Sequence, residues 1–126
     1  MAISILILVG VAALLAAGSA SAQSIEETLA IVQTGISHPP AEIVKEFDRV
    51  LTGLERKCQQ QRTSTPGSVG LGDMAMKAVQ SLANGGRSTT PAYLLHALNA
   101  AIPDEIGKRD CAPVLSALVL EMGGRK

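Results

Sequence analysis

Apolar residues recur at every third or fourth position along most of this chain, the spacing that places side chains on one face of an α-helix. Residues 39–58 show this most clearly, because charged and polar residues fill the positions in between. Their apolar positions are Ile43, Val44, Phe47, Val50, Leu51, Leu54 and Cys58. A sustained alternation with a period of two, which would indicate β-strands, does not occur in the sequence. The pattern therefore predicts an all-α fold.

Glycines, prolines and capping residues divide this pattern into short helices. Ser24 and Glu27 form a capping box that starts the first helix, Thr90 followed by Pro91 starts the fourth, and Asp110 caps the fifth. The expected helices cover residues 24–35, 39–58, 71–84, 90–102 and 110–122. We therefore expect a small bundle of four to five short helices, in which the first either docks on the others or remains a loosely held arm.

The first 22 residues have the composition of a secretory signal peptide. Residues 3–17 are almost wholly apolar, and small residues follow, ending in Ala20-Ser21-Ala22, which predicts cleavage before Gln23. The apolar run is about 15 residues long, short of the ~20 that a membrane-spanning helix needs. No Lys or Arg precedes the run, which departs from the signal-peptide pattern and leaves a retained N-terminal anchor as the alternative.

This interpretation divides the chain into a cleaved signal peptide at 1–22, a short helix or arm at 23–38, and a helical domain at 39–126. The mature protein would be secreted, or periplasmic if it comes from a Gram-negative bacterium, with no stable membrane insertion after cleavage. The roughly 100 residues that remain are enough for one domain with one modest core.

The two cysteines, Cys58 and Cys111, are expected to form a disulfide that staples the bundle, because export would bring them into an oxidising compartment. Both continue apolar stripes, Cys58 four residues after Leu54 and Cys111 three residues before Val114. A bridge between them would close a loop of about 50 residues, for which chain entropy gives roughly 4 kcal/mol of stabilisation. The alternatives are two buried free thiols or a bridge to another molecule.

Charge and aromatic content argue against nucleic acid as a partner. The chain has 11 basic and 11 acidic residues, so it is formally neutral and has no net attraction for phosphates or an anionic membrane surface. It contains one Phe, one Tyr and no Trp, whereas proteins that bind single-stranded nucleic acid stack bases on aromatic side chains. We therefore expect neither partner.

The sequence contains no enzymatic signature. The stretch GLGDMA at 70–75 matches a loose dinucleotide-binding fingerprint, but a polar linker precedes it where that motif requires a strand. No G-x-S-x-G elbow places a nucleophile, and His38 and His96 lack the further ligands that a metal site needs. We predict a protein that is not an enzyme and that has no catalytic residues, metal or cofactor.

A polar row on the fourth helix is a candidate ligand-facing patch. Tyr93, His96 and Asn99 follow one another at a spacing of three, beside the apolar stripe of that helix. Such a row is also typical of a helix flank that lies half in water. A cleft that brought His96, Tyr93 and an acid together would instead favour a small secreted enzyme.

These observations favour a secreted helical module that acts by binding. Its partner would be an unidentified protein or a small apolar ligand held between helices. A protein-binding form predicts an exposed apolar patch, on the first helix or around Met74 and Met76. A ligand-carrying form predicts a cavity lined by Leu, Val and Ala side chains, with Phe47 at its wall.

Overall fold

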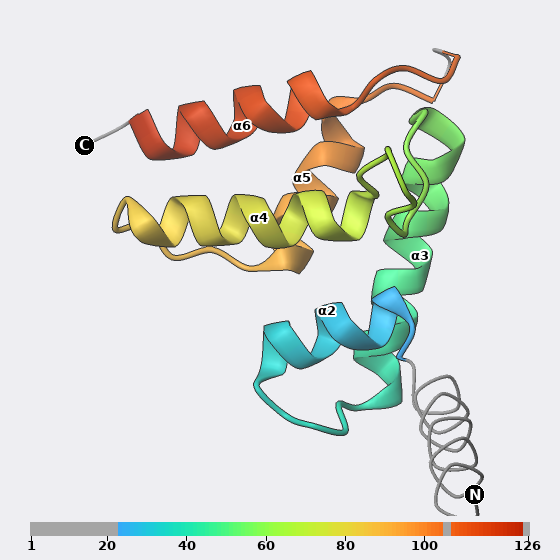
Figure 1. Cartoon of the computed structure of the whole chain (residues 1–126), viewed down its shortest axis with the longest axis vertical. Coiled ribbons are helices and arrows are strands. Elements are labelled where there is room, and N and C mark those ends of the chain that lie inside the picture. The colour runs from blue at the N-terminus through green and yellow to red at the C-terminus, as the bar shows by residue number, and fades with distance from the viewer. Residues whose placement is uncertain (1–22, 105–106, 125–126) are drawn as a thin grey trace, which may run out of the picture.

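The computed structural model describes residues 23–104 and 107–124, so the predicted signal peptide at 1–22 lies outside the described residues. The described backbone forms five α-helices and no β-strand, which confirms the prediction of an all-α fold. The helices are α2 (Ile25–Thr34), α3 (Ala41–Lys57), α4 (Leu71–Asn84), α5 (Pro91–Ala101) and α6 (Ala112–Gly124) (Figure 1). None of these five has both the length and the hydrophobicity that a membrane span requires.

Helix boundaries coincide with the capping residues of the sequence. The Ser24 hydroxyl accepts a hydrogen bond from the Glu27 N–H at 3.1 Å and donates one to the Glu27 carboxylate, so the capping box of α2 is formed. Gly35 ends α2 in the left-handed conformation, with φ of 71°. The Thr90 hydroxyl accepts from the Tyr93 N–H at 3.2 Å and caps α5. These side chains satisfy backbone donors that the first turn of a helix leaves free.

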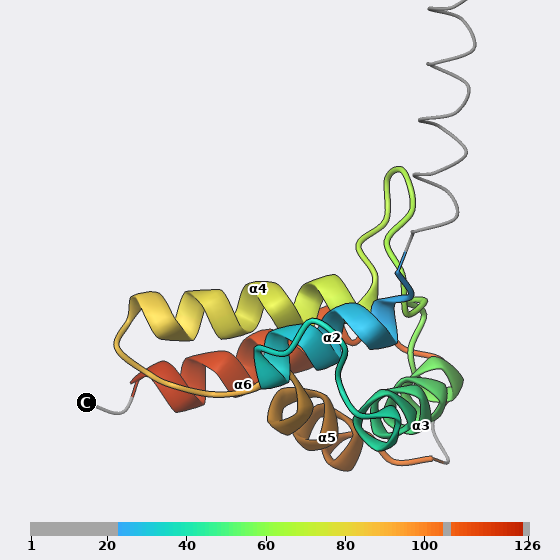
Figure 2. The ribbon, with the colours of Figure 1, turned by 90° about the horizontal axis from the view of Figure 1, so that it is seen from below.

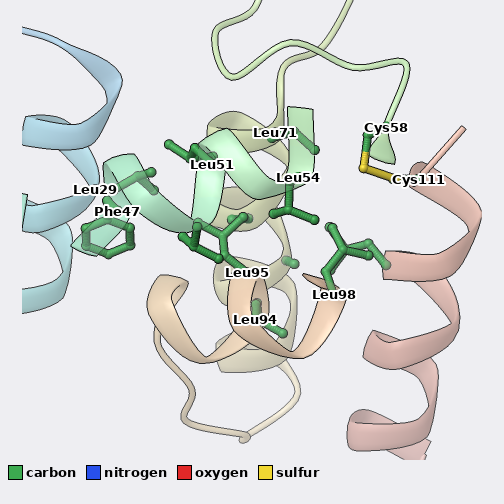
Figure 3. Close-up of a cluster of buried hydrophobic side chains, with 14 of the residues drawn as sticks. Leu29, Phe47, Leu51, Leu54, Cys58, Leu71, Leu94, Leu95, Leu98 and Cys111 are labelled. Carbon is green, nitrogen blue, oxygen red and sulfur yellow. A yellow bond between two sulfur atoms is a disulfide. The ribbon is translucent and has the colours of Figure 1, made fainter. Parts of the chain in front are cut away.

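The core lies where α2, α3, α4 and α5 meet, and leucine dominates it (Figure 3). Its fully buried side chains include Leu29, Phe47, Leu51, Leu54, Leu71, Leu94, Leu95 and Leu98. Burial of one Leu or Phe side chain contributes about 1.5–3 kcal/mol relative to leaving it in water. The cluster therefore supplies a large part of the apolar driving force that holds the four helices together.

The short helix α2 is packed into the bundle. It contacts α3, α4 and α5, and its residues Leu29 and Ala30 are both 0% exposed. The Gln33 Oε1 atom accepts a hydrogen bond from the Ala92 N–H at 3.1 Å, one of the donors that the first turn of α5 leaves free. This short helix therefore docks on the others and is not a loosely held arm.

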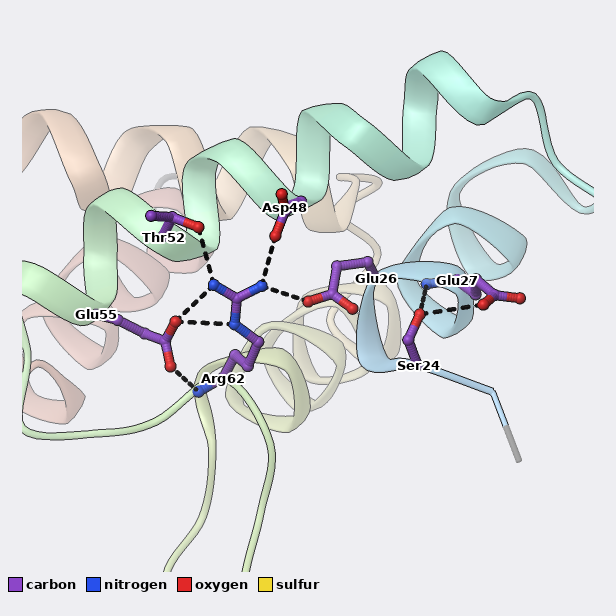
Figure 4. A network of polar contacts seen from close by, with 7 residues as sticks. All are labelled: Ser24, Glu26, Glu27, Asp48, Thr52, Glu55 and Arg62. Atoms are coloured by element: carbon purple, nitrogen blue, oxygen red, sulfur yellow. Dashed lines mark hydrogen bonds and ion pairs between the residues drawn. The ribbon is translucent and has the colours of Figure 1, made fainter. Parts of the chain in front are cut away.

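Arg62, in the connection between α3 and α4, joins that connection to both α2 and α3 (Figure 4). Its guanidinium donates to Glu26 Oε1 at 2.5 Å and to Asp48 Oδ1 at 2.7 Å. It also donates to Thr52 Oγ1 at 2.9 Å and, through Nη2 and Nε, to Glu55 Oε1 at 2.6 and 2.8 Å.

The environment of Arg62 favours its charged form. The side-chain hydrogen bond to Glu55, followed by those to Asp48 and Glu26, holds the pKa of Arg62 above its ordinary value, although partial burial acts in the opposite direction. The side chain is 23% exposed, so water screens these contacts less than it screens a pair at the surface. Arg62 is consequently a structural cation.

Cys58 and Cys111 form the predicted disulfide, with a sequence separation of 53 residues (Figure 3). The bridge joins the end of α3 to the residue that precedes α6, and both cysteines are buried. Beside it, the Gln59 N–H donates to the Arg109 carbonyl at 2.8 Å, and the Arg109 N–H donates to the Lys57 carbonyl at 3.0 Å. Covalent and hydrogen-bonded links thus connect the same two chain segments.

Two glycines of the GLGDMA stretch occupy positions where other atoms approach too closely for a side chain. A Cβ on Gly70 would lie 2.3 Å from the Thr63 carbonyl carbon, and one on Gly72 would lie 2.3 Å from Ile25 Cγ1. An irregular connection at 58–70, and not a strand, precedes them. Close packing against the connection and α2 therefore accounts for both glycines without a bound nucleotide.

Candidate functional site

Helices α4 and α6 run side by side in the same direction at one edge of the bundle (Figures 1 and 2). An apolar hollow of about 480 Å³ lies between them, within the range of ~300–1,000 Å³ that is typical of small-ligand pockets. Both helices contribute to its lining. The lining residues are Met74, Lys77, Ala78, Ser81, Ala112, Leu115, Ser116, Val119 and Leu120.

A second hollow continues the first toward the C-terminal ends of the two helices. It measures about 280 Å³ and shares Ser81, Val119 and Leu120 with the first hollow. Its other lining residues are Leu82, Gly85, Arg87 and Gly123. Because the linings overlap, the two hollows form one continuous depression, which we call the α4–α6 groove.

The apolar character of this groove comes largely from α6. The sequence of that helix, APVLSALVLEMGG, contains only Ser116 and Glu121 as polar side chains. A helix that is apolar on all sides is normally buried on all sides, yet α6 packs mainly on α4 and α5 at the edge of the bundle. Leu115 faces the core and is 6% exposed, whereas Leu120 is 73% exposed. The described residues therefore leave part of an apolar helix in contact with water.

The ionisable side chains that line the groove are both cations, Lys77 and Arg87. Lys77 lies on α4, and Arg87 lies just after it, on the way to α5. Arg87 is half-buried and lines the second hollow, whereas Lys77 is exposed and lines the first. Within residues 23–104 and 107–124, neither cation forms a salt bridge.

The start of α6 is fixed to the end of α3. The Gln60 Oε1 atom accepts a hydrogen bond from the Cys111 N–H at 3.0 Å, and Gln60 Nε2 donates to Asp110 Oδ1 at 2.5 Å. Asp110 Oδ1 also accepts from the Ala112 N–H at 3.1 Å, which gives Asp110 the capping role that the sequence predicts. Together with the disulfide, these contacts hold one end of the groove wall in place.

The residues of the polar row on α5 lie in different environments. Tyr93 is 59% exposed and lines a hollow of about 260 Å³ together with Thr90 and Met122, among others. His96 does not line that hollow; its Nε2 lies 3.0 Å from Glu46 Oε1 on α3, and both side chains are 47% exposed. The proposed ligand-facing role of this row stays a prediction.

Asn99, the third member of the row, packs against α3. Its side chain lies next to Gly53, where an added Cβ would be 3.5 Å from Asn99 Oδ1. Its main-chain carbonyl accepts a hydrogen bond from Lys57 Nζ at 2.9 Å, and Lys57 also lies 3.7 Å from Asp104 Oδ1. Asn99 Oδ1 is buried without a hydrogen-bond partner among the described residues. Asn99 thus belongs to the contact between α3 and α5.

Other candidate residues lie away from the groove. His38 lines a separate surface hollow of about 570 Å³ beside Pro39 and Val44. Phe47 is buried at 1% exposure and borders a hollow of mixed polarity between α2, α3 and α5, so it is not a wall of the α4–α6 groove. The described part of the chain groups no three His, Cys, Asp or Glu side chains in a way that could hold a metal ion.

Sequence reasoning pointed to apolar surface around Met74 but did not identify Lys77, Arg87 or Leu120 as part of a site. The composition of 112–124, where apolar residues are not confined to one stripe, is a signal that could have found Leu120, whereas Lys77 and Arg87 lie outside that segment. Comparisons of the chain with protein-family models, with curated proteins and with solved structures found no match. The site is therefore defined by its geometry: an apolar groove between two parallel helices, flanked by two cations.

Proposed function

We propose that this chain is a secreted, non-enzymatic binding module whose binding site is the α4–α6 groove. The observation that carries the proposal is the exposed apolar surface of α6, with Leu120 at 73% exposure beside a hollow of about 480 Å³. Apolar surface is unfavourable in water, and contiguous patches of it are typical of sites that a partner covers. The disulfide and the apolar N-terminal stretch support export.

A small apolar ligand fits this groove better than a folded protein does. Nine residues line the first hollow and seven line the second, three of them shared. A stable protein–protein interface of standard size uses about 20–30 residues on each side. The extent of the groove therefore favours the ligand-carrying form of a binding module.

The composition of the lining supports binding without catalysis. Acid–base or nucleophilic chemistry needs a titratable group or an activated hydroxyl facing the substrate. The groove contains the hydroxyls of Ser81 and Ser116, but its lining includes neither a histidine nor an acid that could activate them. The paired His96 and Glu46 belong to the contact between α5 and α3 instead.

The proposal predicts that a bulky side chain in the groove abolishes the binding of an apolar probe. We expect the neutral dye N-phenyl-1-naphthylamine to bind the native protein, and Ser116→Trp to weaken that binding at least about ten-fold because the indole occupies the space of the dye. The matched control is Ala117→Trp, because Ala117 is exposed on the same helix outside the groove lining. Dye fluorescence titrated against protein concentration measures both affinities.

Circular dichroism and thermal unfolding of both variants show whether they retain the native fold. Equal dye binding by the native protein and by folded Ser116→Trp contradicts the proposal, because it places the dye elsewhere. The absence of dye binding to the native protein also contradicts it.

A further inference from the structure

We infer that the occupant of the α4–α6 groove is a single long-chain apolar molecule with one anionic headgroup, such as a free fatty-acid carboxylate, and that Arg87 holds the anion while Lys77 adds positive charge farther along the groove. The inference rests on the proposed function and deepens it by naming the chemistry of the ligand. Three features of the groove support it: the apolar lining, the two cations in that lining and the elongated shape.

The charge of the groove is a local feature. The whole chain has equal numbers of basic and acidic residues, 11 of each, yet both ionisable side chains in the lining are basic. A ligand with an anionic group is the complement of such a lining. The planar guanidinium of Arg87 offers two parallel N–H donors that match the two oxygens of a carboxylate, whereas the ammonium of Lys77 acts as a point charge. Arg87 is therefore assigned as the principal anchor.

The shape of the groove favours a chain over a compact ligand. The two hollows lie in line along α4, a helix of 14 residues and thus about 21 Å long. Small side chains at Ala78, Ser81, Ala112 and Ser116 leave space between the two helices. Arg87 belongs to the hollow nearer the C-terminal ends of α4 and α6. A hydrocarbon tail can therefore lie in the first hollow with its headgroup beside Arg87 in the second.

The test compares dodecanoate with 1-dodecanol, which has the same chain length and no charge, as competitors of the neutral dye. Measurements are made at a pH where the carboxylate is ionised and below the concentrations at which either compound aggregates. We expect dodecanoate to displace the dye at about a five-fold lower concentration than dodecanol, the effect of one partly exposed ion pair. We also expect each methylene added between decanoate and dodecanoate to tighten binding about three-fold.

Charge-removing variants locate the anion. Arg87→Gln is expected to abolish the preference for the acid over the alcohol, and Lys77→Gln to reduce it by less. For each variant the preference is the ratio of the alcohol and acid concentrations that displace half of the dye, so a change in the affinity for the dye itself cancels. Arg49→Gln is the matched control, because the Arg49 side chain is 70% exposed on α3 and does not line the groove. It should leave the preference unchanged.

The outcomes separate this inference from the proposed function. Equal displacement by acid and alcohol, with dye binding intact, overturns the inference and leaves the proposed function in place, whereas loss of all dye binding overturns both. A preference that falls equally in Arg49→Gln and Arg87→Gln also overturns the inference, because the effect is then not local. If light scattering shows a dimer that Ser116→Trp dissociates, the occupant of the groove is a second copy of the chain and the inference is overturned. If the protein binds phosphatidylglycerol vesicles but not monomeric dodecanoate, the occupant is a membrane surface and the inference is also overturned.

Discussion

Arg62 ties the connection that follows α3 both to α3 and to α2, whose Glu26 lies 36 positions away in the sequence. Most ion pairs between exposed side chains contribute less than about 1 kcal/mol, because water screens them and the side chains lose conformational freedom. Arg62 differs because it is only 23% exposed and donates to three carboxylates and one hydroxyl. Removing it would leave several acids close together without their cation.

We expect Arg62→Met to lower the free energy of unfolding by about 2 kcal/mol, between the values typical of surface and buried ion pairs. Arg62→Lys should lower it by about half as much, because lysine keeps the charge but lacks the planar fork. Urea unfolding measures both. The control is Arg49→Met, whose pair with Glu46 is exposed and should contribute less than about 0.5 kcal/mol.

The pKa of Arg62 sets the pH dependence of this effect. That pKa is raised in the folded state by the hydrogen bond to Glu55 and then by those to Asp48 and Glu26. The stabilisation is therefore fully present at any pH below the pKa that the Arg62 side chain has in the unfolded chain. It is lost only as the pH rises through the higher folded-state pKa, in strong alkali. The difference between native protein and Arg62→Met should thus be the same at about pH 7 and about pH 9. A difference that shrinks over this range would contradict the assignment.

Individual contacts were predictable from the sequence only where they are local or where few partners exist. The Ser24 cap and the Asp110 cap follow from residues two or three positions away. The disulfide between Cys58 and Cys111 follows from there being two cysteines, both on apolar stripes. The contacts of Arg62 were not predictable in this way, because its acidic partners lie 7 to 36 positions away.

The helices themselves were largely predictable, since their ends are determined by local caps, glycines and prolines. Their burial was less predictable where a helix lies at the edge of the bundle. Four apolar residues of α6, Val114, Leu118, Val119 and Met122, are only partly buried, and Ala101 at the end of α5 is exposed. The neighbours of a helix at the edge of the bundle depend on how all the helices pack together. The spacing of apolar residues along one helix, with 3.6 residues per turn, does not specify that packing.

The junction between the irregular connection and α4 depends on close backbone packing. We expect Gly70→Ala to lower the free energy of unfolding by about 2 kcal/mol, because its Cβ would lie 2.3 Å from the Thr63 backbone, which no rotamer change relieves. Gly107→Ala should change it by less than about 0.5 kcal/mol, because no atom lies within 4 Å of the added Cβ. Thermal unfolding compares the two variants. Equal effects would show that the connection moves aside freely.

The disulfide stabilises the bundle as a whole, since it links the two ends of the segment that contains α4 and α5. We expect Cys58→Ala/Cys111→Ala to lower the free energy of unfolding by about 2–4 kcal/mol, mainly through greater freedom of the unfolded chain. A reductant should lower the stability of the native protein by a similar amount and leave the variant unchanged. If neither the double substitution nor the reductant changes the free energy of unfolding, side-chain packing alone stabilises the bundle.

An apolar hollow between helices was an expectation from the sequence, but its place in the fold was not predictable. An apolar cavity between helices is an expectation that follows from alanine-rich helices and missing catalytic groups, and the expected wall residue was Phe47. The structure instead places Phe47 in the core and the groove between α4 and α6. Arg87 could not be assigned to this groove beforehand, because it lies in the turn after α4 and meets α6 only through the fold.

The covalent link between Cys58 and Cys111 also determines what a protease can do to this molecule. The exposed polar connection at 59–69 is the kind of segment that proteases cut first. A single cut there opens a ring without releasing a fragment, so all five helices remain in one covalent piece. A nicked molecule would therefore run as one species on a non-reducing gel and separate into two only after reduction.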